Sequence, residues 1–224
     1  MALFADRREA GARLGETLRQ RLGAPDDPGG LQPLVLGLPR GGVIVAAEVA
    51  QALQCPIDVV VVRKLGHPAR PELGLGALAE TGERVLNQPL VHRLQVPEQI
   101  LAVVTDAERL EARRRVAHYR GGRPPLPLRG RVAVIVDDGL ATGYTALVAV
   151  ESVRGRGASR VVVAVPVGSA DTVAMLATRA DTVICLASPP DLSVVGEAYR
   201  DFSETHDDEV VAVLERLGRS PAGG

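Results

Sequence analysis

Runs of consecutive apolar residues alternate with segments of helical spacing along most of the chain. The apolar runs are rich in β-branched residues and predict strands at 34–38, 57–62, 131–136, 160–166 and 181–186. Helical spacing predicts helices over 6–22, 43–53, 97–120, 144–156 and 170–179, and a short one from Asp207 or Asp208. Because the strands are continuously apolar and separated by helices, we predict an α/β fold with a parallel sheet covered on both faces.

Glycine, proline and charged residues interrupt this pattern. Asp6 is a plausible N-cap for the first helix and Gly23 a plausible stop, followed by a loop at 23–30. Residues 63–82 predict a loop with room for a short hairpin, and 121–130 predict a linker within the domain.

Charge and composition exclude several classes of protein. The 224 residues carry a formal net charge of −1, which predicts no general attraction to nucleic acid or to an anionic membrane. The run Arg113–Arg115 predicts a solvated helix face. Aromatic residues make up 2% of the chain, so a base-stacking surface is not expected.

Other features bear on location. The chain has no apolar run of about 18 residues and no signal-peptide pattern, so we expect a cytoplasmic protein. Cys55 and Cys185 lie among apolar residues and are expected to be reduced, packed side chains.

In parallel sheets, ligands bind beyond the carboxyl ends of the strands. Three segments with distinct chemistry follow predicted strands: the turn 39–42 (PRGG), the pair 63–64 (RK), and 137–145 (DDGLATGYT). We therefore expect these segments to meet at one edge of the sheet.

The small-residue loop from Gly139 to Thr145 leads into a predicted helix. Backbone N–H groups at a helix start have no partner within the helix, and Thr142 and Thr145 add hydroxyl donors, so the loop suits a phosphate. Gly143 lets the chain approach such a ligand closely. A Walker A lysine is missing and no G-x-G-x-x-G follows a strand, which argues against nucleoside triphosphates and dinucleotides.

Asp137 and Asp138 stand at the entrance of this loop and would repel a phosphate, so they should face another part of the ligand. Sugar hydroxyls or a bound divalent cation would satisfy them. 5-Phosphoribosyl 1-pyrophosphate (PRPP) combines a terminal phosphate, a ribose diol and a metal-binding diphosphate. The alternative is a pair of aspartates that caps the next helix.

The stretch VAVIVDDGLATGYTA (132–146) resembles the PRPP-binding signature of the type I phosphoribosyltransferases. The stretches LGLPRGG, VVVRKLG and RDFSE resemble a group of bacterial proteins described as phosphoribosyltransferases without a named acceptor. The resemblance implies a three-layer, Rossmann-like core at about 34–190 in a single domain spanning 1–224. It also implies a small hood, which we assign to the N- and C-terminal segments, with the inserted residues 64–96 as another source.

The resemblance implies a role for each segment. Asp137 and Asp138 would hold the ribose hydroxyls and stabilise charge on the sugar. The turn after the first strand would hold pyrophosphate through Arg40, Gly41 and Gly42, and in this family it often contains a cis peptide. The residues expected to hold the 5-phosphate are Gly139, Leu140, Ala141, Thr142, Gly143, Tyr144 and Thr145.

Basic residues would complete the site. Arg63 and Lys64 would lie at the pyrophosphate, and the loop that follows them would close over the ligand. Asp137, Asp138, Arg40 and Lys64 would then be the catalytic residues, with Mg²⁺ bound through PRPP near the two aspartates.

These features imply a Mg²⁺-dependent transferase of nucleotide metabolism that moves phosphoribose to a nitrogenous acceptor, such as a nucleobase. The alternatives are a PRPP-binding regulator without transferase activity and an enzyme that hydrolyses PRPP. The expected partners are PRPP and a small acceptor, with neither nucleic acid nor membrane. A homodimer is one open arrangement, because type I enzymes are often dimers.

The acceptor stays open. Ala141 stands where phosphoribosyltransferases for 6-oxopurines carry an aspartate, so the loop is closer to the adenine type. The aromatic residue that usually stacks on the base is replaced by Ser193 or Val194, while Tyr199 and Phe202 are near but not aligned.

Overall fold

The computed structural model describes residues 2–22, 32–192 and 194–218. The predicted helix stop at Gly23, the loop 23–30 and Ser193 therefore lie outside the described residues. Within the described part of the chain, no helix has the length and apolar character needed to cross a membrane.

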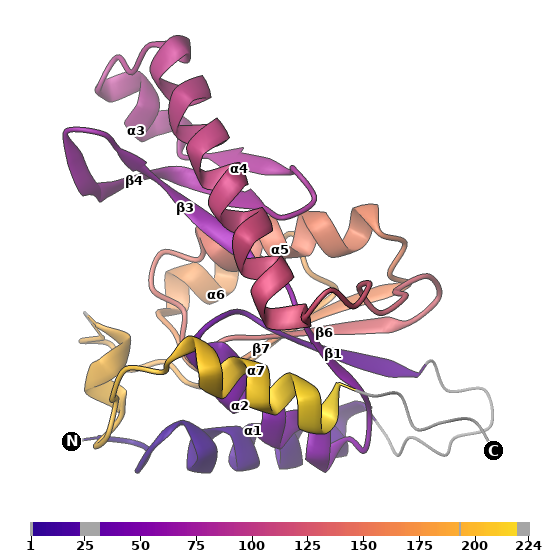
Figure 1. Ribbon diagram of the computed structural model, residues 1–224. Helices are drawn as coiled ribbons and strands as arrows, with labels where there is room; N and C mark the ends of the chain where they lie inside the picture. The colour runs from indigo at the N-terminus through magenta and orange to yellow at the C-terminus, as the bar shows by residue number, and fades with distance from the viewer. Residues whose placement is uncertain (1, 23–31, 193, 219–224) are drawn as a thin grey trace.

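A parallel sheet of five strands forms the centre of the molecule (Figure 1), as the sequence predicts. In spatial order its strands are β2 (Ile57–Val59), β1 (Pro33–Gly37), β6 (Val132–Val136), β7 (Arg160–Val167) and β8 (Thr182–Ala187). The chain runs outward from β1 to β2 in one direction and from β6 to β8 in the other. The strand order therefore reverses between β1 and β6, which is where open α/β sheets bind ligands.

Helices cover both faces of this sheet and give the expected three layers (Figure 1). The helices on one face are α1 (Arg7–Leu22), α2 (Gly41–Ala52) and α7 (Asp207–Leu217), and those on the other are α5 (Tyr144–Gly155) and α6 (Ala170–Ala177). Asp6 caps α1 as predicted, since its Oδ1 accepts the N–H of Glu9 at 2.9 Å.

An antiparallel sheet of three strands rises beside the core and forms the hood. It consists of β3 (Val62–His67), β4 (Arg70–Ala79) and β5 (Arg84–Leu86), followed by α3 (Gln88–Arg93) and α4 (Glu98–Arg120). The hood sheet thus comes from an inserted segment. The division of the chain into one domain stays a prediction.

Two expectations for this region are wrong. The predicted strand 57–62 ends at Val59, and Val62 already belongs to β3. The loop predicted at 63–82 is mostly strand: β3 and β4 form a hairpin longer than the short one that the sequence allowed, because Leu65, Leu75 and Leu78 pack against α4 in a separate small core. Its glycines are accommodated as register shifts between β3 and β4 rather than as a loop.

The two terminal segments meet beside the core. Phe4 and Tyr199 form a short parallel bridge, and the N–H of Arg200 bonds to the carbonyl of Phe4 at 2.9 Å. A 3₁₀ turn, η1 (Val195–Ala198), precedes this bridge. The pairing brings the start of α1 and the segment after β8 together at the carboxyl edge of the sheet.

A buried group of charges joins the hood to the core. Arg120, at the end of α4, contacts Asp58 of β2 at 3.0 Å and Glu80 after β4 at 2.9 Å, and it donates to the carbonyl of Val59 at 2.8 Å. The three charged side chains are 5–8% exposed. Burial acts to lower the pKa of Arg120, but Asp58 and Glu80 outweigh it and raise the pKa. The guanidinium therefore stays charged and links the two sheets.

Arg120→Ala should destabilise the protein by roughly 3–5 kcal/mol, because it leaves two buried carboxylates without their cation. Arg109→Ala is the matched control, since Arg109 on the same helix pairs with the exposed Asp106. It should change the free energy of unfolding by no more than about 0.5 kcal/mol. Urea unfolding of both variants measures the difference, and equal effects would contradict the role given to Arg120.

Candidate ligand-binding site at the carboxyl edge of the sheet

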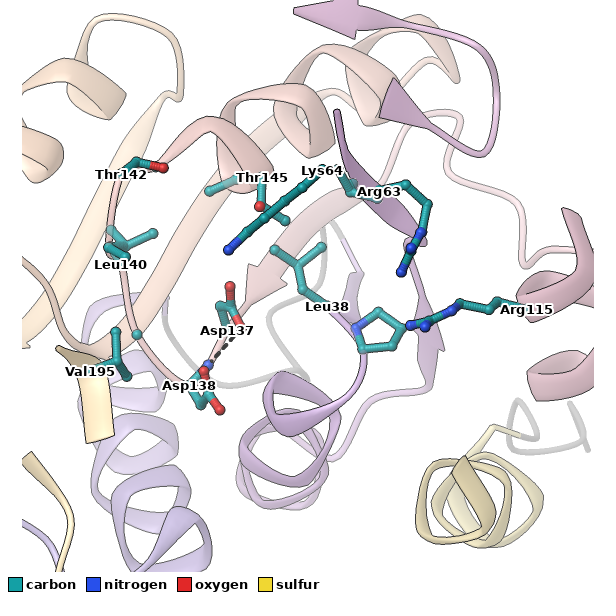
Figure 2. A pocket seen from close by; sticks show the side chains of 16 residues that line it. Leu38, Arg63, Lys64, Arg115, Asp137, Asp138, Leu140, Thr142, Thr145 and Val195 are labelled. Atoms are coloured by element: carbon teal, nitrogen blue, oxygen red, sulfur yellow. Dashed lines mark hydrogen bonds between the residues drawn. The ribbon is translucent and has the colours of Figure 1, made fainter. Parts of the chain in front are cut away.

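A cavity of about 450 Å³ opens at the carboxyl ends of β1 and β6 (Figure 2). All three segments singled out in the sequence contribute to its wall. The lining residues are Leu38, Pro39, Val62, Arg63, Lys64, Arg115, Asp137, Asp138, Gly139, Leu140, Ala141, Thr142, Gly143, Thr145, Ala146 and Val195.

The loop before α5 is tied to the neighbouring strand and helix. The N–H of Leu140 donates to the carbonyl of Val167 at 2.8 Å, and the hydroxyl of Thr172 donates to the carbonyl of Ala141 at 2.9 Å. Gly143 has φ = 74°, and a Cβ there would lie 2.6 Å from Thr172 Cγ2. Glycine is therefore required by both conformation and space.

The start of α5 offers hydrogen-bond donors to the cavity. The N–H of Leu147 bonds to the carbonyl of Gly143, so the N–H groups before it have no acceptor within the helix. Thr142 and Thr145 lie on this wall, and Figure 2 shows their side chains beside the cavity. Free N–H groups, two hydroxyls and the positive end of a helix dipole together suit a phosphate.

Asp137 follows β6 and points into the cavity beside Lys64 (Figure 2). Its Oδ1 accepts the N–H of Asp138 at 2.9 Å. Burial and then the charge of Asp138 raise the pKa of Asp137 well above its usual range, while the N–H of Asp138 and Lys64 act to lower it. A carboxylate held in this unfavourable setting would gain from sugar hydroxyls or a cation.

Asp138 also lines the cavity, but it has a partner from the N-terminal helix. Arg7 Nε donates to Asp138 Oδ2 at 2.8 Å, and the two side chains are 12% and 18% exposed. The guanidinium of Arg7 stacks 3.8 Å from the ring centroid of Phe202. Tyr199 donates its hydroxyl to the carbonyl of Asp138 at 2.5 Å. The paired terminal segments thus hold Asp138 in place through Arg7 and Tyr199.

The aspartates do not cap the next helix. The residue at the N-cap of α5 is Gly143, and no side chain makes a cap hydrogen bond there. The alternative that the sequence left open for this pair is therefore wrong, and both aspartates line the cavity, with Asp138 paired to Arg7.

The turn after β1 lies directly against the aspartates. A Cβ at Gly41 would lie 2.0 Å from Asp138 Oδ2, and one at Gly42 would lie 2.8 Å from Asp137 Cα. The peptide bond between Pro39 and Arg40 is cis. Close packing against the aspartates accounts for both glycines, which themselves lie outside the lining of the cavity.

Two further expected residues point elsewhere. The side chain of Arg40 is paired with Glu204 rather than lining the cavity. Tyr144 packs its ring with Ala77 and Ala79 of the hood. Contacts of any of these residues with PRPP stay predictions.

Arg63 and Lys64 line the cavity, and Arg63 is held by Glu108 at 2.7 Å. Arg115 lines it too, so the prediction of one solvated face over Arg113–Arg115 is wrong for this residue. Arg113 and Arg114 are exposed, whereas Arg115 is half-buried. Helical phase was the available signal, because Arg115 lies one turn from the buried Ala112 and Tyr119.

The segment after β8 contributes less than expected. Val195 lines the cavity, whereas Val194 is exposed. Tyr199 and Phe202 stack on each other, with ring centroids 5.0 Å apart, and neither lines the cavity. These two aromatic residues therefore pack the terminal segments together.

Known proteins resemble this chain over most of its length. The family model described as phosphoribosyl transferase domain matches residues 15–199. Two Mycobacterium tuberculosis proteins provisionally named phosphoribosyl transferases, MT0597 and Rv0571c, are 49% identical over 219 residues, which is 98% of this chain and 48% of theirs. The chain thus spans about half the length of the curated relatives it matches. The crystal structure of TT1426 from Thermus thermophilus is 44% identical, covers 98% of this chain and 100% of its own, and superposes with a TM-score of 0.78.

Asp137→Asn should make the protein more stable at neutral pH. A pKa raised on folding means that the stability due to the protonated carboxyl is complete below the unfolded pKa of about 3.9 and is lost as pH rises through the folded value. Asparagine does not titrate, so its advantage should grow from about pH 4 upward. Denaturant unfolding across this range measures the gain.

Asp181→Asn should change the stability of the protein in the opposite direction. The N–H of Val161 lowers the pKa of Asp181, so this carboxylate adds stability above its unfolded pKa and loses it in acid. The variant should therefore be less stable than wild type at neutral pH, with the difference shrinking as pH falls. If the free energy of unfolding changed with pH in the same way in the two variants, the environment assigned to Asp137 would be wrong.

Proposed function

Because this chain belongs to the phosphoribosyl transferase domain family, we propose that it transfers 5-phosphoribose from PRPP to a small nitrogenous acceptor and releases pyrophosphate. The observation that carries the proposal is a cavity in which two adjacent carboxylates lie between a helix start suited to a phosphate and a wall of cationic side chains. In PRPP the ribose diol lies between a phosphate and a diphosphate. These groups come in the same order as the parts of the cavity that would bind them, namely the helix start, the two carboxylates and the cationic wall.

The ligand would lie along the edge of the sheet. Its 5-phosphate would take the N–H groups and the hydroxyls of Thr142 and Thr145 at the start of α5. Its diol would donate to Asp137 and Asp138. Its diphosphate would then extend toward Lys64 and the turn after Pro39. This orientation pairs every negative group of the ligand with donors or cations.

The same residues would favour the transition state. As pyrophosphate leaves C1, positive charge develops on the ribose ring, close to Asp137 and Asp138. Negative charge develops on the departing group, beside Lys64. Fixed charges that match charge formed during the reaction lower the barrier more than contacts to the ground state do.

We include Mg²⁺ in the proposal as an ion that arrives with the diphosphate. Among the described residues, no group of three or more His, Cys, Asp or Glu side chains could hold a metal ion by itself. One or two carboxylates together with substrate phosphates and water suit Mg²⁺, so Asp137 and Asp138 fit this role. The ion would neutralise part of the charge on the diphosphate.

The apolar part of the cavity wall bears on the kind of acceptor that would fit. Leu140 and Val195 give this part of the cavity an apolar surface, with Ala141 next to them. No aromatic side chain lines the cavity within the described residues. A small planar base held by apolar contact and backbone groups fits such a wall.

The test is an assay of PRPP with Mg²⁺ and a panel of nucleobases and other nitrogenous compounds, with pyrophosphate as the readout. Release that requires one acceptor supports the proposal. Release without any acceptor would indicate hydrolysis, and PRPP binding without release would indicate a regulator. Absence of PRPP binding would refute all three.

Asp138→Asn should lower the rate of pyrophosphate release by about 10²-fold or more, because it removes a negative charge next to the developing positive charge. The change is isosteric and leaves the backbone carbonyl that accepts from Tyr199. Asp106→Asn, at an exposed site on α4, is the control and should keep full activity. Circular dichroism checks the fold, and an Asp138→Asn variant with near-normal rates would contradict the assigned role.

A further inference from the structure

The cations of the cavity gather on one side. Arg63 and Lys64 come from β3 and Arg115 from α4, so all three belong to the inserted hood unit. Figure 2 shows Arg63 and Arg115 reaching toward the same region near Leu38, while Lys64 points toward Asp137. Leu140, Thr142 and Val195 lie on the opposite side.

This arrangement separates two regions of the cavity that differ in charge. The start of α5, with Thr142, offers neutral donors, whereas the Arg63 and Arg115 side offers full positive charges. A ligand with its single phosphate at α5 would place its more highly charged end against the arginines. Guanidinium groups suit such an end, because they bind phosphate oxygens in a bidentate manner.

Arg115 is held where it can serve this purpose. Tyr119, one turn further along α4, donates its hydroxyl to Asp207 of α7 at 2.7 Å and so fixes the helix against the core. Burial and Asp207 raise the pKa of Tyr119 to about 12, and Arg115 and Arg40 act in the opposite direction. The effects of Arg115 and Arg40 on this pKa indicate that Tyr119 lies near Arg115 and near the turn after β1.

The resting partner of Arg115 can release it. Glu111 Oε1 accepts from Arg115 at 2.8 Å, but Glu111 also accepts two bonds from Arg114, at 2.7 and 2.9 Å. Hydrogen bonds from Arg114 and then Arg115 lower the pKa of Glu111 to about 2. When Arg115 turns toward an anion, Glu111 keeps its contacts with Arg114. Partly exposed pairs of this kind are weak, so the exchange of partner costs little.

We propose that Arg115 binds the pyrophosphate part of PRPP, together with Arg63 and Lys64, and thereby makes α4 of the hood part of the binding site. This inference rests on the proposed function, because it assumes that PRPP occupies the cavity. It gives the hood a direct role in holding the leaving group.

Arg114 provides a matched control. It is adjacent in sequence, lies on the same helix and shares Glu111, but its side chain is 61% exposed and does not line the cavity. Arg114→Ala and Arg115→Ala therefore remove the same type of side chain and the same ion-pair partner. Only the second removes a cation from the cavity.

The experiment is calorimetric titration of wild type and both variants with PRPP, inorganic pyrophosphate and ribose 5-phosphate, in the presence of Mg²⁺. Arg115→Ala should weaken binding of PRPP and of pyrophosphate by about 10- to 100-fold, the usual effect of losing a charge-assisted hydrogen bond. Binding of ribose 5-phosphate should change by less than about twofold, because that ligand lacks the diphosphate. Arg114→Ala should match wild type for all three ligands. Arg115→Lys should fall between wild type and Arg115→Ala, because lysine keeps the charge without the bidentate geometry.

The outcomes separate this inference from the proposed function. Wild type that binds none of the three ligands refutes both. Wild type that binds PRPP, with Arg115→Ala equally tight, refutes only the role of Arg115. Equal losses in Arg114→Ala, or an equal loss for ribose 5-phosphate, would place the effect in Glu111 or in the fold and would also overturn the inference. Thermal unfolding of each variant confirms that the folded protein is being titrated.

Discussion

The buried contact of Arg120 with Asp58 and Glu80 holds the inserted hood against the parallel sheet. It joins the last turn of α4 and the end of β4 to the edge strand β2, and so fixes the inserted sheet relative to the parallel one. Lys64, Arg63 and Arg115 all belong to that inserted unit. Their positions at the cavity therefore depend on the contact that Arg120 makes at the C-terminal end of α4. A network of buried charges is directional, which suits a junction whose orientation matters more than its strength.

Some groups around the cavity are in settings that are unfavourable for the stability of the folded protein. Asp137 keeps a raised pKa because burial and Asp138 disfavour its charge, and only Lys64 and one backbone N–H oppose them. Gly41 and Gly42 allow the turn after β1 to press against both aspartates, where a single methyl group would collide. Sites that must bind charged ligands commonly keep such unsatisfied groups, because a group already paired within the protein has less to gain from the ligand.

Segments distant in the sequence divide the work around this cavity. The parallel core supplies the aspartates and the helix start, the hood supplies the cations, and the terminal segments support Asp138 through Arg7 and Tyr199. Arg40 is paired with Glu204 of the C-terminal segment. The two terminal segments thus contact both turns at the point where the strand order reverses. Glu204 pairs with Arg40 in the turn after β1, and Arg7 pairs with Asp138 after β6.

The sequence by itself determined the parallel sheet, its helices and the loop from Gly139 to Thr145, because apolar runs, helical spacing and small residues before a helix are local signals. It also brought Asp137, Asp138, Arg63 and Lys64 to one edge, since the ends of parallel strands meet there. Only the tertiary structure decided that 63–82 is sheet, because its glycines suggest a loop until Leu65, Leu75 and Leu78 find a helix to cover them. The same holds for Arg7, whose partner Asp138 follows β6, and for Arg115, which lines a cavity whose other walls come from distant elements. Side chains of one type look alike along a sequence, and only packing determines which of them faces solvent and which faces a cavity.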